Sequence, residues 1–505
     1  MATRTPSTSG NWRADDADTW GLGAGVYPAA TDHVEIDGGH TVTLGEDNTC
    51  ASIRILSTLV GGGHTLTLQD GASQAVIFNH DGTIHAGSDL NVTITGTTSR
   101  QIDSLGTNNV NNLTIAPSSG TPTFSMITAM TLDGGLTITG GTLDTDSSSN
   151  HALTVAGTTQ VTGTLTCNAS TISLGSGLTS GWGLDIQSGG TFTGGTGTHT
   201  IGSIFAAGGG TRTITLSSGA TTINSKNTGN GFTINLASGA TFNHGGGTVT
   251  MTYAGNTLNQ LSGGTLAFNT FTYNASGRTL ELRSPMSCAG NLTLTAGTLD
   301  TKSGTNHALT VTGDAIIDGT LTGNASAISL GSLAVGGTYS ATSGTTTITS
   351  ERSNGRAVDT TGTYTHNGGI LKIQTAADTD LRWPSSSNCN HIIIDHASCI
   401  ARPTGDNKPP IAGNLLINQG KFSLLDSDGS STHQCTVTGD VIIGDGSGSA
   451  NTAIFEGRDD SVTFGSLTID SDGKYDATSG TTEITSAASN YAVTNNGTLT
   501  HNDGT

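Results

Sequence analysis

The sequence predicts an all-β protein that winds as an elongated parallel β-helix, and three observations lead to this prediction. Short segments such as LTITG (136–140) and TISLG (171–175) alternate apolar residues with Thr or Ser. Gly, Asn, Asp or Ser interrupts such segments at intervals of roughly 8–12 residues, which is typical of short strands joined by tight turns. Long phrases also recur in the same order along the chain.

The recurrence is clearest in GTLDTDSSSNHALTV (141–155) and GTLDTKSGTNHALTV (297–311), which agree at twelve of fifteen positions. A third, more distant copy is KFSLLDSDGSSTHQCTVTGDVII (421–443). These and other phrases divide the chain into an N-terminal head or cap and three long solenoid units, the first of which holds an extra coil near 204–240. The predicted boundaries are 1–79, 80–243, 244–365 and 366–505.

A solenoid explains these repeats better than a sandwich or a propeller. The inward positions carry small to medium side chains, as a narrow stacked core requires, and the units differ in length without losing their order. A solenoid gains coils one at a time, each in contact only with its neighbours. With about 20–25 residues in a coil and coils about 4.8 Å apart, we expect roughly 20–25 coils.

The third unit closes on LTHNDGT (499–505), whereas the earlier units continue from FNHGGG (242–247) and YTHNGG (364–369) into a further strand. Thr505 therefore falls in the middle of the pattern. This break in the repeat leads us to expect that the native chain continues past Thr505 or that its last coil docks on another subunit.

The charge balance argues against two classes of partner. The 505 residues carry 18 Lys and Arg against 38 Asp and Glu, a net charge of −20. Nucleic acid and anionic membrane surfaces would be repelled. The chain contains no run of 18 apolar residues, so membrane insertion is not predicted. The opening MATRTPSTSGNW lacks the apolar core that is typical of a secretion signal.

Histidines recur at equivalent places in the repeats. The functional interpretation is a metal or sugar contact, and the alternative is a corner residue that bonds to the backbone. We expect the alternative, because no HxH or HExxH spacing occurs. The residues concerned are His151, His307 and His433 after a turn, and His80, His244, His366 and His501 at the unit ends.

Acidic residues gather at four places in the sequence. LDTDSSSN (143–150) and LLDSDG (424–429) resemble calcium loops, but the middle copy of the repeat places Lys302 where Asp146 stands. GRDD (457–460) is an adjacent carboxylate pair, and neighbours on a strand point to opposite faces. Asp15, Asp16 and Asp18 lie in the head. We expect no catalytic, cofactor-binding or metal-ligating residue, and no cofactor.

The six cysteines form no CxxC pair. Cys288, Cys389 and Cys435 align with Leu, Ile, Val or Phe in other copies of the repeat, so we expect small core hydrophobes rather than a disulfide framework. The others are Cys50, Cys167 and Cys399.

The least repetitive stretch is 381–410, LRWPSSSNCNHIIIDHASCIARPTGDNKPP. It contains Trp383, Arg382, Arg402, Lys408 and four prolines. Proline interrupts β-ladders, so we expect the flanks of this stretch to bulge outward. It is the predicted place for a specific contact.

The head, SGNWRADDADTWGLGAGVYPAATDHVEIDGGHTVTLGEDNTCASIRI (9–55), and phrases such as GTYSATSGTTTITS (337–350) resemble repeat-bearing β-solenoid proteins of phage virions and bacterial surfaces. The resemblance implies a structural or adhesive role and carries over no catalytic residue. Trp12, Trp20 and Pro28 then belong to an N-terminal cap or attachment piece.

The expected function is that of a non-enzymatic virion structural protein, a phage fibre or spike located in the virion. Its expected partners are other virion or filament subunits and a host surface glycan or receptor. By analogy with phage fibres it would form a homo-oligomer, a trimer. The alternatives are an extracellular or cell-surface bacterial adhesin or filament and, third, a polysaccharide-degrading β-helix enzyme.

Overall fold

The computed structural model describes residues 2–505 except 14–18, 24, 71–73, 88, 105, 107, 238, 254–257, 265, 384–386, 405–409, 426–433, 449 and 489–490. The described residues form strands and no helix, so none of them makes a helix that could cross a membrane. The strands wind as a parallel β-solenoid of about 19 turns, which confirms the predicted fold with slightly fewer turns than expected.

The chain separates into two compact units, Met1–Gly255 with Asn259–Gly264 and Asn256–Leu258 with Thr265–Thr505. We describe each by itself. The division into a head and three repeats remains a prediction from the sequence.

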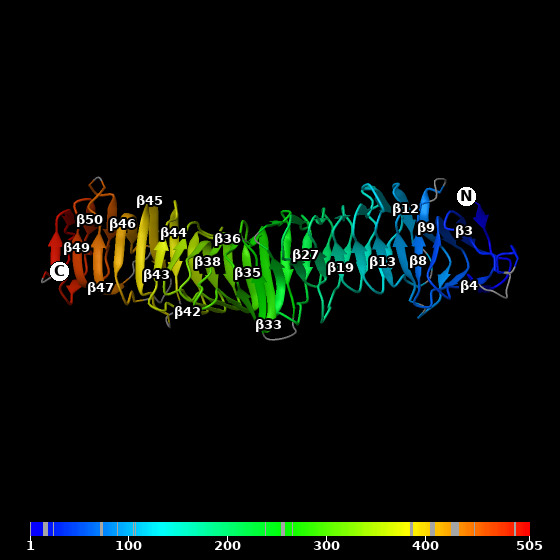
Figure 1. Ribbon diagram of the computed structural model, residues 1–505. Coiled ribbons are helices and arrows are strands. Elements are labelled where there is room, and N and C mark those ends of the chain that lie inside the picture. The colour runs from blue at the N-terminus through cyan, green and yellow to red at the C-terminus, as the bar shows by residue number, and fades with distance from the viewer. Residues whose placement is uncertain are drawn as a thin grey trace. The chain divides into compact units, whose positions relative to one another are not determined.

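Each turn of unit 1 contributes strands to separate parallel ladders (Figure 1, blue to green). We call the 11-stranded ladder the first sheet. Its strands are β1 (Thr3–Arg4), β3 (His33–Ile36), β6 (Ser52–Ile55), β9 (Val76–His80), β12 (Arg100–Asp103), β14 (Thr123–Met126), β17 (Thr142–Asp144), β20 (Thr164–Thr166), β23 (Thr191–Thr193), β26 (Arg212–Thr215) and β29 (Ala240–Asn243).

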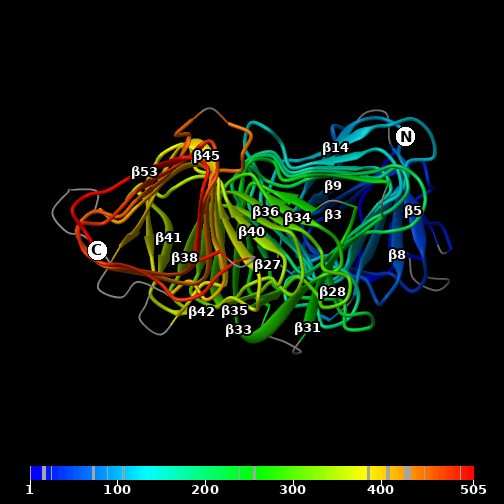
Figure 2. The same ribbon diagram turned by 90° about the vertical axis from the view of Figure 1, so that its left-hand side faces the viewer.

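The other ladders of unit 1 complete the turns. The second ladder contains β5 (Asn48–Cys50), β8 (Thr65–Leu68), β11 (Asn91–Ile94), β13 (Asn112–Ile115), β16 (Leu136–Ile138), β19 (Thr159–Val161), β22 (Leu184–Ile186), β25 (Ile204–Ala206) and β28 (Phe232–Leu236). On the remaining side lie β2 (Gly10–Asn11), β4 (Thr41–Thr43), β7 (Thr58–Val60) and β10 (Thr83–Ile84), and later β15 (Met130–Leu132), β18 (Leu153–Val155), β21 (Ile172–Leu174), β24 (His199–Ile201), β27 (Ala220–Ile223) and β30 (Thr248–Met251). Figure 2 shows β3, β9 and β14 of the first sheet on one side of the turns and β5 and β8 on another.

From β15 onward in unit 1, the three-residue strands of the first sheet alternate differently from those of the other ladders. In β20, Leu165 points into the core while Thr164 and Thr166 point outward. In β18, Leu153 and Val155 are buried and only Thr154 is exposed. Such strands of the first sheet therefore place two residues on the outer face, as β4 and β7 also do, whereas the three-residue strands of the other ladders from β15 onward in unit 1 bury both of their end residues.

Unit 2 has longer strands, several of which continue around a corner. They are β32 (Leu266–Phe268), β33 (Thr270–Leu282), β34 (Met286–Cys288), β35 (Leu292–Asp300), β36 (Leu309–Ile317), β37 (Thr320–Thr322), β38 (Ile328–Val335), β39 (Thr338–Ser340), β40 (Thr345–Ile348), β41 (Arg356–Thr360), β42 (Thr363–Thr365), β43 (Ile370–Ile373), β44 (Asp378–Arg382), β45 (His391–Thr404), β46 (Leu415–Ser423), β47 (Cys435–Ile443), β48 (Ala453–Glu456), β49 (Val462–Ile469), β50 (Gly473–Asp476), β51 (Thr482–Ile484), β52 (Val493–Asn495) and β53 (Thr498–Thr500). β31 (Leu258–Ser262) lies where the units divide.

Repeated phrases form repeated corners. Asp146 and Lys302, which occupy the same position in GTLDTDS and GTLDTKS, have φ angles of 67° and 68°. Asn168 and Asn324, further along the same copies, both have a φ of 48°. Asn tolerates this left-handed region better than most residues, so the repeat preserves backbone geometry at these corners as well as strand pattern.

The expected bulges fall at the flanks of 381–410, where 384–386 and 405–409 lie outside the described residues. Residues 391–404 form β45, and Pro403 pairs with Leu381 of β44 inside the parallel ladder. Pro403 lies near the end of β45, beyond Ala401, the last residue of this strand paired with β46. The pairing of β45 with β46 therefore ends before Pro403, so the missing N–H of this proline interrupts no hydrogen bond between these two strands.

Candidate functional site

The outer face of the first sheet is hollowed at two adjoining places in unit 1, which we call together the polar trough. The Arg100 hollow has a volume of about 480 Å³ and the Arg54 hollow about 330 Å³, and Ala75 lines both. The Arg100 hollow is lined by Ser99, Arg100, Gln101, Thr123, Ser125, Asp144, Asp146 and Ser147. The Arg54 hollow is lined by Thr3, His33, Glu35, Ile53, Arg54, Gln74, Val76 and Asn79.

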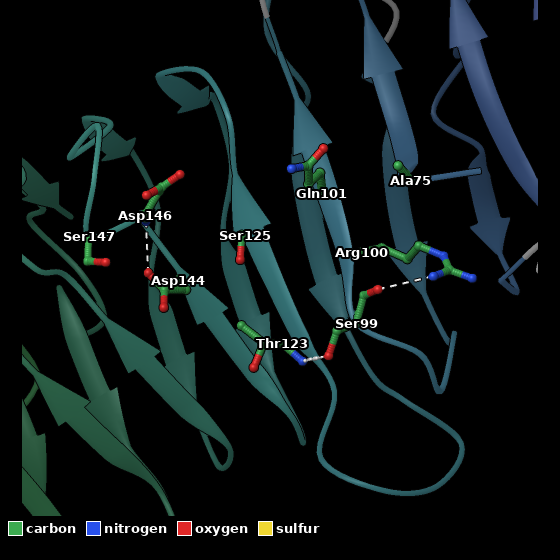
Figure 3. A pocket seen from close by; sticks show the side chains of 9 residues that line it. All are labelled: Ala75, Ser99, Arg100, Gln101, Thr123, Ser125, Asp144, Asp146 and Ser147. Carbon is green, nitrogen blue, oxygen red and sulfur yellow. Dashed lines mark hydrogen bonds between the residues drawn. The ribbon is translucent and has the colours of Figure 1, made fainter. Parts of the chain in front are cut away.

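The parallel register aligns the side chains of the Arg100 hollow. Gln101 pairs with Ser125, and Ser125 pairs with Asp144, so one polar side chain from each of β12, β14 and β17 follows the next across the strands (Figure 3). The loops before β12 and after β17 add Ser99 and Asp146. The hollow therefore crosses several turns rather than following one.

Arg100 is held in place at the wall of this hollow. Its Nη2 lies 2.9 Å from Asp70 Oδ1, and the two side chains are only 14% and 8% exposed. Its Nη1 also donates to the carbonyl of Ser99 (Figure 3). Because a largely buried guanidinium with a fixed partner loses little freedom on binding, it is a suitable preformed donor.

The carboxylates of the hollow are suited to accepting hydrogen bonds. Asp144 Oδ1 accepts from the backbone N–H of Asp146 at 2.8 Å and from Asn168 Nδ2 at 2.6 Å. Hydrogen bonds from the Ser148 hydroxyl and backbone N–H lower the pKa of Asp146. A carboxyl group that acts as a general acid at neutral pH needs a raised pKa, so Asp146 is suited to binding rather than proton donation.

The Arg54 hollow has a weaker charge network. Arg54 lies 3.7 Å from Glu35 and 4.0 Å from Asp81, measured between nitrogen and carboxylate oxygen. His33 Nδ1 lies 2.8 Å from Ser52 Oγ, and burial, aided by the positive charge of Arg54, lowers the pKa of His33. At neutral pH this end of the trough therefore presents a neutral imidazole beside exposed charged groups.

Three of the predicted histidine corners have the backbone role that the sequence suggested. The backbone N–H two residues on donates to Nδ1 of His244, His366 and His501, at 2.8, 2.9 and 3.2 Å. His80 differs from them, because it lies on β9 and is fully buried. Its side chain therefore lies in the core rather than at an exposed corner. His151 and His307 are half-buried, and His433 lies outside the described residues.

The acidic candidates that the structure describes bond to neighbouring groups. Asp144 and its counterpart Asp300 each accept a bond from the following corner, as described for Asp144. Asp459 accepts from the Ser479 hydroxyl, and Arg458 pairs with Glu456 at 2.6 Å. Within the described residues, no group of three or more His, Cys, Asp or Glu side chains is arranged to hold a metal ion. Asp15, Asp16, Asp18 and 426–433 lie outside those residues.

The remaining predictions concern buried groups. All six cysteines are described and buried, and for Cys288, Cys389 and Cys435 the alignment of the repeats predicted this burial. Trp12 and Trp20 of the head are also buried and meet edge to face at 5.2 Å, and Pro28 is buried as well. In the 381–410 stretch, Trp383 is buried, Arg382 lies near Asp359, Arg402 pairs with Asp378, and Lys408 lies outside the described residues.

Sequence reasoning missed the polar trough. Gln101, Ser125 and Asp144 are separated in the chain by coils of unequal length, and only the strand register brings them together. The available signal was the polar residue at an outward position in each of the segments RQI, TFS and TLD. These residues form a site only when the strands are stacked in register.

Comparison of the chain with family models, curated proteins and solved structures finds no match. Its function is therefore argued from the trough and from the fold that builds it.

Proposed function

We propose that this protein is a non-enzymatic fibre or spike-type structural protein of a phage virion and that the polar trough binds a polysaccharide on the host surface. The observation that supports the adhesive role is the register of Gln101, Ser125 and Asp144 beside Arg100. This set offers amide, hydroxyl, carboxylate and guanidinium groups to one ligand. Sugar hydroxyls both donate and accept, so such a mixture matches them.

The trough also suits a chain ligand. It crosses parallel strands about 4.8 Å apart, and its two hollows adjoin at Ala75. A polymer lying across the strands would meet a new set of polar groups in each turn. We therefore expect affinity to rise with glycan length until the trough is filled.

A glycan array is the first test of binding. We expect the wild type to bind a subset of oligosaccharides, and Gln101→Ala with Ser125→Ala to lose that binding. Thr154→Ala with Thr131→Ala is the matched control, because these threonines are exposed on a different ladder, on β18 and β15. Equal glycan binding by the trough variant and the wild type would contradict the proposal.

Immunogold labelling of the native source with an antibody to residues 2–13 and 19–60 tests the location. Gold on phage particles supports the virion role, and its position distinguishes a tail appendage from a capsid decoration. Gold on cell envelopes or free filaments would instead favour the bacterial adhesin. Release of reducing ends from a bound glycan would favour the polysaccharide-degrading enzyme.

The proposal includes assembly with other subunits. A homo-oligomer, a trimer by analogy, is expected from sedimentation equilibrium of the purified chain. A monomer that still binds glycans would support the adhesive role and contradict the proposed trimer.

A further inference from the structure

The first sheet carries two columns of short polar side chains that begin in the trough and continue beyond it. The first column consists of Thr123, Thr142, Thr164, Thr191, Thr213 and Thr241, each paired with the next in parallel register. The second column consists of Ser125, Asp144, Thr166, Thr193, Thr215 and Asn243, paired in the same way.

The core beneath these columns keeps the face regular. One apolar residue separates the two outward residues in each strand, and Leu165, Phe192 and Ile214 are all 0% exposed. These residues anchor β20, β23 and β26 at the same depth. Threonine is β-branched and stiff about χ1, so side chains in equivalent backbone positions present methyl and hydroxyl groups in the same direction.

The result is a two-dimensional lattice. Adjacent threonines in a column are about 4.8 Å apart, and the two columns are about 6.6 Å apart, twice the rise per residue in a strand. We call the central part, on β20, β23 and β26, the threonine face. It consists of Thr164, Thr166, Thr191, Thr193, Thr213 and Thr215, all half-buried.

The threonine face has no outward charge, although the chain carries a net charge of −20. On the second ladder, the three-residue strand β19 has one outward position, which holds Gln160, and its partner in β22, Asp185, is buried. The ladder of β15 to β30 also carries threonine, but in a single column of Thr131, Thr154, Ser173, Thr200, Thr222 and Thr250. The second column is therefore what distinguishes the threonine face and makes its array two-dimensional.

Unit 2 contains a second lattice of the same kind. Its strands β37, β39 and β42 pair in parallel register and again bury one residue between two outward ones. The outward residues are Thr320, Thr322, Thr338, Ser340, Thr363 and Thr365. Five of these six are threonine, so the same pattern occurs separately in each compact unit. We call this second set the unit 2 threonine face.

We propose that the two threonine faces bind the surface of ice crystals. The ligand that suits an uncharged lattice is one that itself repeats in two dimensions, as the oxygen atoms at the surface of an ice crystal do. Each methyl group constrains its first-shell water, and each hydroxyl both donates and accepts a hydrogen bond. A regular array of the two can hold water molecules at lattice positions.

The threonine face is chemically distinct from the polar trough. The trough offers charged, directional groups such as Arg100 and Asp144 in a concave site, whereas the threonine face repeats one small side chain. A single sugar needs different groups on its different edges, while an ice surface needs the same group at every lattice point. Ice binding is therefore independent of the proposed glycan adhesion.

The experiment measures thermal hysteresis, ice-crystal shaping and partition of the purified chain into a slowly grown ice hemisphere. We expect the wild type to shape ice and to enter the hemisphere. Thr166→Lys with Thr193→Lys should reduce both activities, and adding Thr320→Lys with Thr322→Lys should abolish them. Lysine places a long charged side chain on the lattice without touching the core.

The matched control carries four lysines on other ladders and so gives the same change in charge. Its substitutions are Thr131→Lys on β15, Thr154→Lys on β18, Ser287→Lys on β34 and Thr310→Lys on β36, all at outward positions. Circular dichroism and melting curves should be unchanged in both sets. No ice shaping by the wild type, or equal loss in the control, would overturn the proposal, while glycan binding through the trough would be unaffected by either result.

Discussion

The side-chain amide of Asn168 donates to Oδ1 of Asp144 in the preceding turn at 2.6 Å. Asn324 makes the same bond to Asp300 in unit 2 at 2.7 Å. In both places the asparagine has a φ of 48°, and the carboxylate also accepts the backbone N–H two residues after it. One carboxylate thus ties the end of its strand to the corner of the next turn.

Asn168→Ala should open this corner. The variant loses a hydrogen bond to a charged acceptor and forces alanine into the left-handed region, which it tolerates less well than asparagine, a combined cost of about 2–4 kcal/mol. Because each turn of a solenoid contacts only its neighbours, the loss should be local. Hydrogen exchange of the β17 and β20 amides measures it.

Asn168→Gly separates the two contributions. Glycine accepts the φ angle but lacks the amide, so its cost should be about half that of alanine. Asn324→Ala should reproduce the effect at β35 and β37. Unchanged exchange in both alanine variants would show that the corner does not depend on this bond.

Glycine-to-alanine substitutions at corners should differ in their cost to stability, depending on which atoms the new Cβ would contact. Gly195 and Gly120 both have positive φ, 66° and 73°. A Cβ on Gly195 would collide with the carbonyl oxygen of Asn168, whereas none of the surrounding atoms lies within 4 Å of a Cβ on Gly120. Gly120→Ala should cost about 1 kcal/mol from backbone strain alone.

Gly195→Ala should cost several times more, on the order of 3 kcal/mol or above, since backbone of the preceding turn must move. Urea unfolding followed by hydrogen exchange in unit 1 compares the two variants. Equal destabilisation would mean that the preceding turn accommodates the methyl group freely.

The fold could be predicted from the sequence because a parallel solenoid repeats one simple rule. Alternation in LTV, TLT and ISL determines which residues face the core, and Leu153, Leu165 and Ile172 are indeed buried. The polar trough could not be predicted in this way. Its residues meet only through the register between coils of unequal length, which depends on how many residues each corner absorbs.

Individual residues show the same limit. The segment LDTDSSSN suggested a calcium loop, yet Asp144 accepts a hydrogen bond from the backbone of its own corner. In the other copy of the repeat, Lys302 has nearly the same φ angle as Asp146, so the corner keeps its backbone conformation with either residue. His80 and His244 stand in similar phrases, FNHDG and FNHGG, but only His80 is buried. His80 is the last residue of β9, whereas His244 follows the end of β29.

The cysteines should be unreactive in the folded protein. All six are buried, and burial raises the pKa of Cys288 to about 12 and that of Cys50, Cys167 and Cys389 further. The thiolate is the reactive form, so Ellman's reagent should react only as the chain unfolds and should then titrate six thiols. Rapid reaction of any thiol in the native protein would contradict this burial.

The last prediction concerns His199, which lies in the core of unit 1. On β24 it pairs with Ile172 and Thr221 of the adjacent turns, its side chain is 0% exposed, and its ring meets Phe192 edge to face at 5.9 Å. Burial lowers the pKa of His199 to about 4, although a contact with the Gly194 backbone acts in the opposite direction. The imidazole is therefore neutral in the folded protein at neutral pH.

A folded-state pKa below the unfolded value of about 6.5 means that the unfolded chain binds the proton first. Stability is then complete above pH 6.5 and declines as the pH falls toward 4, by about 3 kcal/mol in total. Carboxylates with a lowered pKa, such as Asp32, lose their contribution to the free energy of unfolding mainly at a pH below this range. The decline between pH 6.5 and 4 should therefore depend strongly on His199.

His199→Leu should flatten the stability of unit 1 across this range, because leucine suits a position stacked between Ile172 and Thr221. Urea midpoints at pH 7, 5.5 and 4.5 measure the effect, and His151→Leu at a half-buried corner is the control. The wild type and the control should lose stability with acid while His199→Leu changes little. If all three decline in parallel, the acid sensitivity of unit 1 lies in other groups.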